Sequence, residues 1–381
     1  MGNHTGVRHN RWHAGAALSI GMIVALALLE VGLRLAAVPA VELHRRAPVT
    51  FDDHRRFFAY DPELGWRGRP SANGPFAGWE FVTRVRLNKL GFRDAARWRH
   101  KGPAQYEVLL LGDSITWGYG VEEGRRYSDL LPMELRKFGI DAVINNVAVP
   151  GYDTGLELLL YRQLRGQGCP DLVMIGLYGN DIWENVSPWQ GPYAKPYFRN
   201  QEGQLQLSNV PVPTGDEWSR RQAEMEDPLT GGMKKELRIY ALAAWFRETV
   251  RKMFEDTLPA VAEADPSGIE ITAALLRAWA GEVERDHRRG VVIVLPDESG
   301  LARAETSATE NAAAQSGVMP VIRLTGAFRE AAHAVHRPLF YHLDGAHWTE
   351  QAHELAARHI ARQLMEASLF QEAPRQCREQ T

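Results

Sequence analysis

Three short strings of the chain carry the side chains that nucleophilic catalysis by a serine requires. Gly112-Asp113-Ser114 offers a hydroxyl, Gly179-Asn180-Asp181 offers a side-chain amide, and Asp344-Gly345-Ala346-His347 offers an imidazole with a carboxylate three residues before it. A serine hydroxyl is a weak nucleophile until a base takes its proton, and a carboxylate keeps that base in the correct tautomer. The first and last strings therefore supply a candidate triad of Ser114, His347 and Asp344.

The same chemistry needs hydrogen-bond donors for the negatively charged oxygen of a tetrahedral intermediate. Gly151, at the end of the string NNVAVPG, offers a backbone amide that no side chain shields, and Asn180 offers a side-chain NH2. Taken singly, each of these strings is more typical of an ordinary turn. A phosphate-binding loop is the weaker alternative at Gly112, because no Gly-Lys-Ser/Thr ends the loop.

Predicted strands place these strings at one edge of a sheet. The runs 106–111 (YEVLLL) and 172–177 (LVMIGL) are apolar apart from Glu107, as buried parallel strands commonly are, and a shorter strand is predicted over 142–147. Further strands over 291–295 and 319–323 alternate with helical patterns. This alternation predicts a three-layer α/β/α sandwich with a parallel sheet, whose sites lie at the carboxyl ends of the strands.

With these strings in this order, the chain resembles the SGNH hydrolase superfamily, also called the GDSL esterases and lipases, over roughly residues 105–370. The four blocks of that family centre on a Ser, a Gly, an Asn and a His. They match here as Ser114 in GDSITWG, Gly151 in VAVPGYDT, Asn180 in GLYGNDIW and His347 in DGAHWTEQAH. Many members carry an apolar residue and then Asn or Pro after the histidine; here Thr349 is expected to cap the following helix.

The resemblance implies a flavodoxin-like strand order and a set of roles. Ser114 would be the nucleophile, His347 the base and then the acid, and Asp344 its orienting carboxylate. The oxyanion hole would consist of the Ser114 and Gly151 backbone amides and the Asn180 side chain. Asp113 and Asp181 are expected to bind loop backbone, and Trp117, Tyr119 and Tyr152 either wall the pocket or belong to the core.

Three functions fit this pattern. The first is a serine esterase that hydrolyses an O-acyl ester, possibly O-acetyl, of a cell-envelope glycan or lipid through an acyl-Ser114 intermediate. The second is an O-acyltransferase that uses the same triad with a sugar hydroxyl as acceptor. The third is a non-catalytic carbohydrate-binding or scaffold module, against which the intact triad and Asn180 argue.

The pattern of the N-terminal segment predicts a membrane anchor. Residues 14–29 carry no charge, and the apolar pattern continues to Val38, which is long enough to span a bilayer. Glu30 and Arg34 interrupt it at a spacing that allows them to pair. A cleaved signal peptide and a buried core helix are the alternatives. By resemblance, the chain is expected to be a single-pass bacterial envelope protein with its catalytic domain in the periplasm or outside the cell.

The predicted domains are an N-terminal tail and signal-anchor (1–40), a small extension (41–104), the hydrolase domain (105–370) and a C-terminal tail (371–381). Alternation over 79–94 suggests a strand or hairpin in the extension. An insertion at about 183–268, rich in aromatic residues at its start, is too long for an ordinary connection. It is expected to act as a lid or recognition element.

Composition limits the other possibilities. The 381 residues are 45% hydrophobic, enough for a full α/β core. The net charge of −3 gives no reason to expect a nucleic-acid partner. Cys169 and Cys377 are the two cysteines, too few for a metal site or a disulfide framework. A bridge between them outside the cytoplasm is the alternative, and unbridged cysteines are the prediction. No cofactor is expected; the expected partners are the ester substrate and the membrane, and nothing identifies a protein partner.

Overall fold

The computed structural model describes residues 6–35, 55–94, 105–213, 266–334 and 338–370, apart from gaps at 79, 191–192, 303–306 and 343–345. Residue 102 and a few positions between 242 and 250 are also described, and for 6–19 the description is of the backbone alone. The predicted C-terminal tail and most of the second half of the insertion lie outside the described residues.

A parallel sheet of five strands, in the order β13-β12-β7-β5-β6, forms the centre of the fold. Its strands are β5 (Tyr106–Leu111), β6 (Ala142–Asn146), β7 (Leu172–Leu177), β12 (Arg289–Val294) and β13 (Val321–Arg323). Counted along the chain, this is the flavodoxin-like order 2-1-3-4-5. The predicted α/β fold with a parallel sheet and the predicted strand order are confirmed.

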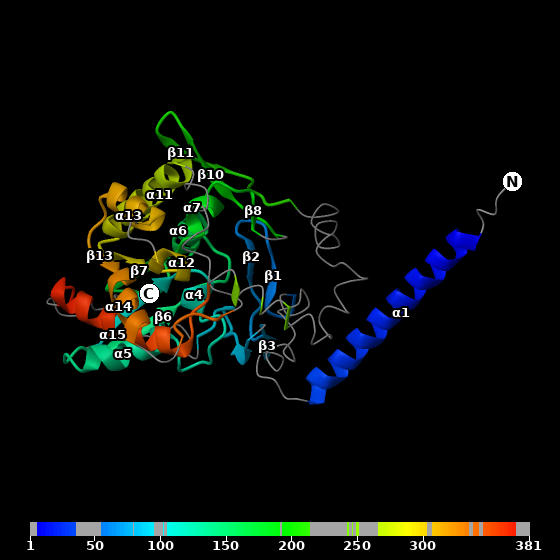
Figure 1. The fold of residues 1–381 in the computed structure, drawn as a ribbon. Helices are drawn as coiled ribbons and strands as arrows, with labels where there is room; N and C mark the ends of the chain where they lie inside the picture. The colour runs from blue at the N-terminus through cyan, green and yellow to red at the C-terminus, as the bar shows by residue number, and fades with distance from the viewer. Residues whose placement is uncertain are drawn as a thin grey trace.

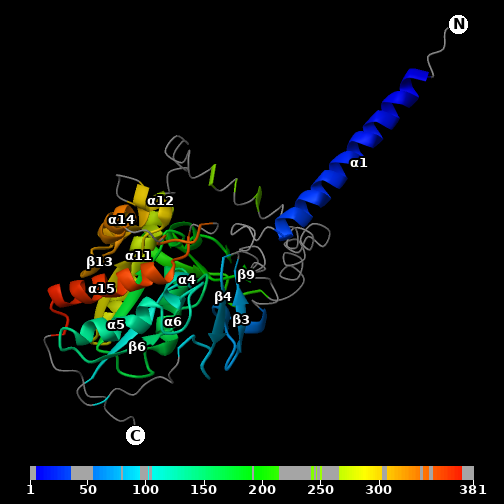
Figure 2. The same ribbon diagram turned by 60° about the horizontal axis from the view of Figure 1, so that its bottom comes forward.

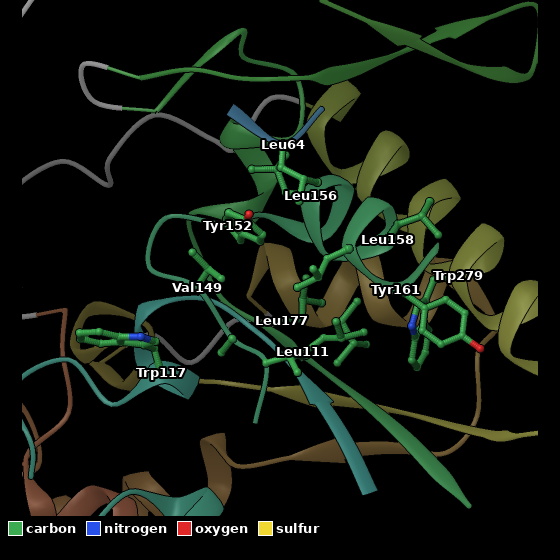
Figure 3. Close-up of a cluster of buried hydrophobic side chains, with 14 of the residues drawn as sticks. Leu64, Leu111, Trp117, Val149, Tyr152, Leu156, Leu158, Tyr161, Leu177 and Trp279 are labelled. Atoms are coloured by element: carbon green, nitrogen blue, oxygen red, sulfur yellow. The ribbon is translucent and has the colours of Figure 1, made fainter. Parts of the chain in front are cut away.

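Helices cover both faces of this sheet (Figures 1 and 2). Leu109 and Leu111 of β5 pack toward one face, whereas Val108 and Leu110 pack toward the other, as alternation along a strand requires. The first face carries α6 (Thr154–Leu164), α11 (Pro266–Arg285) and α13 (Ala308–Ser316). The second carries α5 (Tyr127–Arg136), α14 (Thr325–Ala334) and α15 (Glu350–Glu366). Figure 3 shows the first of these two cores, where Leu111 and Leu177 lie beneath the helices.

The extension before the sheet forms two antiparallel hairpins. One joins β1 (Phe58–Asp61) to β2 (Gly65–Gly68), and the other joins β3 (Asn73–Ala77) to β4 (Val82–Arg86). Phe57, Phe76 and Phe81 are buried in the same core as Trp117 of the sheet domain. The extension is therefore packed onto the sheet domain, while its predicted boundaries stay a prediction.

Helix α1 (Gly6–Leu35) contains most of the predicted anchor and projects away from the sheet domain in Figure 1. The predicted pair forms, since Arg34 Nε donates to Glu30 Oε1 at 2.8 Å. Within the part of the chain that the structure describes, no helix is both apolar and long enough to cross a membrane. The predicted transmembrane span therefore lacks structural support, and its last residues, 36–38, lie outside the described part.

The insertion begins with the short helix α7 (Asp181–Glu184) and continues as small strands. Tyr193 and Phe198 are buried in the core, whereas Trp183 is 60% exposed, so the aromatic residues divide between core and surface. The strands are β8 (Trp189–Gln190), β9 (Tyr193–Ala194), β10 (Tyr197–Gln201) and β11 (Gln204–Ser208).

The cysteine prediction is wrong, because Cys169 is disulfide-bonded. The chain has one further cysteine, Cys377, which lies outside the described residues. Two isolated cysteines gave no sequence signal for a bond, since the chain distance between them says nothing of their distance in the fold.

Candidate active site

Ser114 lies on a tight turn from strand to helix at the carboxyl end of β5. It is the first residue of the short helix α4 (Ser114–Trp117), and Asp113 caps this helix by accepting from the Ile115 amide at 2.9 Å. A Cβ on Gly112 would lie 2.2 Å from Thr116 Oγ1, so the turn has room for glycine alone. The Ser114 amide belongs to the first turn, where backbone N–H groups have no partner within the helix.

His347 lies on the loop before α15, and it meets Ser114 directly. His347 Nε2 and Ser114 Oγ are 2.8 Å apart, within hydrogen-bond distance. The adjacent Trp348 fixes this loop, since its ring is fully buried and its Nε1 donates to the Pro296 carbonyl at 3.0 Å. The structure thus joins the predicted nucleophile and base; the third triad residue, Asp344, falls within 343–345, outside the described residues.

Thr349 occupies the N-cap position of α15 but makes no side-chain cap, so that prediction is wrong. Its hydroxyl donates instead to the Pro338 carbonyl at 2.7 Å. This bond ties the start of the His347 loop to its end. A contact between these two ends was not visible in the local sequence.

The two other predicted oxyanion donors follow the neighbouring strands β6 and β7. Gly151 has a φ of +78°, in the region that favours glycine, and a Cβ there would approach Trp66 and Gln190 at 3.2 Å each. Asn180 precedes helix α7. Its Nδ2 donates to Glu184 Oε2 at 2.9 Å, and its Oδ1 is buried with no hydrogen-bond partner in the described part of the chain.

Several buried carboxyls lie behind these loops. Asp181 accepts hydrogen bonds from the Thr154 and Tyr178 amides, at 2.9 and 2.8 Å, so the prediction that Asp113 and Asp181 bind loop backbone is confirmed. Burial raises the pKa of Asp113 to about 6. Burial, with neighbouring carboxyls, also raises the pKa values of Glu157 and Asp181 well above their usual range. Glu157 and Asp181 are consequently held neutral rather than charged beside the site, whereas Asp113 is neutral only below about pH 6.

Tyr119 is the aromatic residue that contacts the candidate base. Its ring stacks on the His347 imidazole with centroids 4.0 Å apart and planes 23° apart. Phe76 and Phe81 of the extension pack edge-on against Tyr119, each with its ring centroid 5.2 Å from that of Tyr119. Trp117 and Tyr152 are buried in the core instead. The sequence indicated all three aromatic residues but did not show which of them lines the site and which belong to the core, since that depends on the fold.

Comparison with known proteins relates part of the chain to a family. Residues 110–294 match the model of the GDSL-like Lipase/Acylhydrolase family. These residues belong to the GDSL-like lipase and acylhydrolase family. The matched part of this acylhydrolase domain starts within β5 and ends with β12, so it contains Ser114, Gly151 and Asn180.

Individual relatives are similar over smaller parts or at low identity. An arylesterase from Vibrio mimicus is 38% identical over 85 residues, which are 22% of this chain and 42% of that protein. A lipase/acylhydrolase from Enterococcus faecalis aligns over 71% of this chain and all of its own, with 16% identity and a TM-score of 0.37. A two-domain esterase active on acetylated mannans aligns over 73% of this chain and 54% of its own, with 12% identity and a TM-score of 0.39.

The acylhydrolase domain also contains residues at its site that sequence reasoning did not name. Glu184 contacts Asn180, and Lys195 contacts the backbone of Glu184. Neither belongs to a recognisable motif, and Lys195 lies in the insertion. In the described parts of the chain, no group of three or more His, Cys, Asp and Glu side chains is arranged to hold a metal ion.

Proposed function

We propose that the protein is a serine esterase that cleaves an O-acyl ester through an acyl-Ser114 intermediate. The observation that carries this proposal is the 2.8 Å contact between Ser114 Oγ and His347 Nε2. It is the contact through which a base takes the proton of a serine nucleophile. The family match over 110–294 supports the same reaction class.

The reaction follows from the positions of these groups. Ser114 Oγ attacks the ester carbonyl while His347 takes its proton, and the oxyanion that forms accepts hydrogen bonds from the oxyanion donors. His347 then gives the proton to the leaving alcohol, which leaves an acyl-serine. A water molecule, deprotonated by His347, releases the acid. The donors are the Ser114 and Gly151 amides and Asn180 Nδ2, and Asp344 orients His347.

Hydrolysis of p-nitrophenyl esters by a protein that starts at about residue 41 tests this proposal. We expect turnover of p-nitrophenyl acetate and a weaker response to the long palmitate ester, with an acyl-serine mass on Ser114 in quenched samples. Turnover that requires an added sugar acceptor would indicate acyl transfer instead. Absence of both turnover and adduct would contradict enzymatic function.

We also propose that α1 anchors the protein in a bacterial envelope, where an acylated glycan or lipid is the substrate. Apolar side chains of α1 are exposed to an unusual extent, including Ile23 at 65% and Leu28 at 67%. The disulfide of Cys169 supports an oxidising compartment.

Fractionation of cells that express the full chain tests the anchor. We expect the protein in carbonate-washed membranes and its catalytic domain degraded when protease is added to spheroplasts. A chain without residues 1–40 is the control and is expected in the soluble fraction. Full-length protein in the soluble fraction, or protected from protease, would contradict this location.

The stack on the imidazole leads to a separate prediction. His347 becomes a cation as it takes the serine proton, and the face of an aromatic ring attracts a cation by about 0.5–2 kcal/mol. We expect Tyr119→Leu to lower kcat roughly 2- to 30-fold by this estimate, whereas Tyr119→Phe keeps the ring and most of the activity. Equal kcat values for Tyr119→Leu and the wild type would show that the stack makes no catalytic contribution.

A further inference from the structure

Asn180 differs from the other polar residues that begin helices at this site. Asp113 and Asp153 accept hydrogen bonds from the amides of the helices that they start, as N-cap side chains commonly do. Asn180 stands at the N-cap of α7 but has helical backbone angles and makes no side-chain cap. Its side-chain amide is therefore not oriented by the backbone N–H groups of its own helix.

The orientation comes from Glu184, one helical turn later. Asn180 Nδ2 donates to Glu184 Oε2 at 2.9 Å, while Asn180 Oδ1 has no partner among the described residues. A primary amide has two N–H groups, so one remains for an oxyanion. Rotation of the amide by half a turn would exchange Nδ2 and Oδ1 and present an oxygen to the developing negative charge.

We propose that Glu184 is a positioning residue of the oxyanion hole, which fixes the Asn180 amide so that its second N–H points to the oxyanion. This inference rests on the proposed esterase function. Glu184 contacts Asn180 and not the reacting ester, so it acts through another residue.

Lys195 of the insertion holds Glu184 in place. It is fully buried, and its Nζ donates to the Glu184 carbonyl oxygen at 2.7 Å. The same Nζ lies 2.5 Å from Asp153 Oδ2 and forms a buried ion pair with it. Asp153 follows Gly151 by two residues. One buried ammonium thus joins the loop of one oxyanion donor to the helix beside the other.

The charge state of Glu184 gives this proposal a second, independent readout. Burial and the nearby Asp153 raise the pKa of Glu184 to about 8, against the opposing effects of Asn180 and Lys195. The carboxyls of Asp113 and Asp181 are the other titratable neighbours. Below that pH the neutral carboxyl accepts the Asn180 hydrogen bond without adding negative charge near the oxyanion. Above it, the carboxylate opposes oxyanion formation, and we expect kcat to fall.

Two substitutions of Glu184 test the proposal with p-nitrophenyl acetate from about pH 6 to about pH 10. Removal of one oxyanion donor lowers kcat about 10²- to 10³-fold. Glu184→Leu leaves the Asn180 donor in place but no longer holds its orientation, so we expect kcat to fall roughly 10- to 100-fold with KM nearly unchanged. Glu184→Gln keeps an acceptor for Asn180. We expect it to retain the wild-type kcat near neutral pH and to lose the alkaline decrease near pH 8.

Glu282→Leu is the matched control. Glu282 is also a buried glutamate, 7% exposed, and pairs with Arg162 Nη2 at 2.7 Å on the helices α6 and α11. We expect its loss to lower thermal stability but not the kcat of folded protein. If Glu184→Leu does not fold, the pH profile of Glu184→Gln still tests the positioning role of Glu184.

The outcomes separate this inference from the function on which it rests. An active wild type with an unchanged kcat in Glu184→Leu would overturn the positioning role, and so would an alkaline decrease that persists in Glu184→Gln. A wild type with neither turnover nor acyl-serine would overturn the esterase function and, with it, this role.

Discussion

Ser114→Ala is expected to abolish ester hydrolysis, with kcat lowered by on the order of 10⁵-fold or more. The hydroxyl is the atom that becomes acylated, so no neighbouring group replaces it. His347→Ala is expected to have a similar effect, because Ser114 Oγ has its 2.8 Å contact with that imidazole. The two losses are not additive, since each removes the same reaction step.

The measurement is the steady-state rate with p-nitrophenyl acetate, together with the mass of the quenched protein. Neither variant removes a core side chain, and we expect far-ultraviolet circular dichroism spectra like that of the wild type. His359→Ala, which changes a histidine on α15 away from Ser114, is the control for histidine loss and should keep wild-type turnover. Substantial turnover in Ser114→Ala would assign the chemistry to another group.

The second large effect concerns stability. Lys195→Met is expected to lower the free energy of unfolding by about 3–5 kcal/mol, the usual cost of removing one partner from a buried ion pair. Lys195 and Asp153 are 0% and 1% exposed at their side chains, so water cannot solvate the carboxylate that is left. The substitution also leaves the Glu184 carbonyl without its 2.7 Å donor.

A double-mutant cycle distinguishes the ion pair from the loss of packing. Asp153→Asn keeps an oxygen that can accept from the Leu156 amide, now at 2.9 Å, so the cap of α6 is retained. We expect each single variant to be less stable than the Lys195→Met, Asp153→Asn double variant, as measured by urea unfolding. Strictly additive losses would contradict a direct charge interaction between the two side chains.

The central sheet could be predicted because its signal is local. Strands β5 and β7 are apolar runs apart from Glu107 of β5, and parallel strands buried on both faces commonly have that pattern. The positions of Ser114 and Asn180 follow from the same rule, since the carboxyl ends of parallel strands share one edge. The flavodoxin-like strand order came from the family resemblance, and periodicity alone does not specify it.

Other features depended on contacts between distant segments. The hydroxyl of Thr349 binds the Pro338 carbonyl rather than capping its helix, and Tyr119 rather than Trp117 contacts His347. Lys195 reaches Asp153 across 42 positions of the chain, from inside an insertion whose role the sequence left open.

The fold class and the side chains available for catalysis could be read from the amino-acid sequence, because apolar periodicity and motif order are properties of short segments. The packing of separate segments then brought distant groups together. It placed His347 at hydrogen-bond distance from Ser114, as the motifs predicted, and it joined Lys195 to Asp153, which no motif indicated. The physical reason is that burial and hydrogen-bond geometry depend on how separate segments pack, and no local pattern encodes the pairing of two buried polar groups.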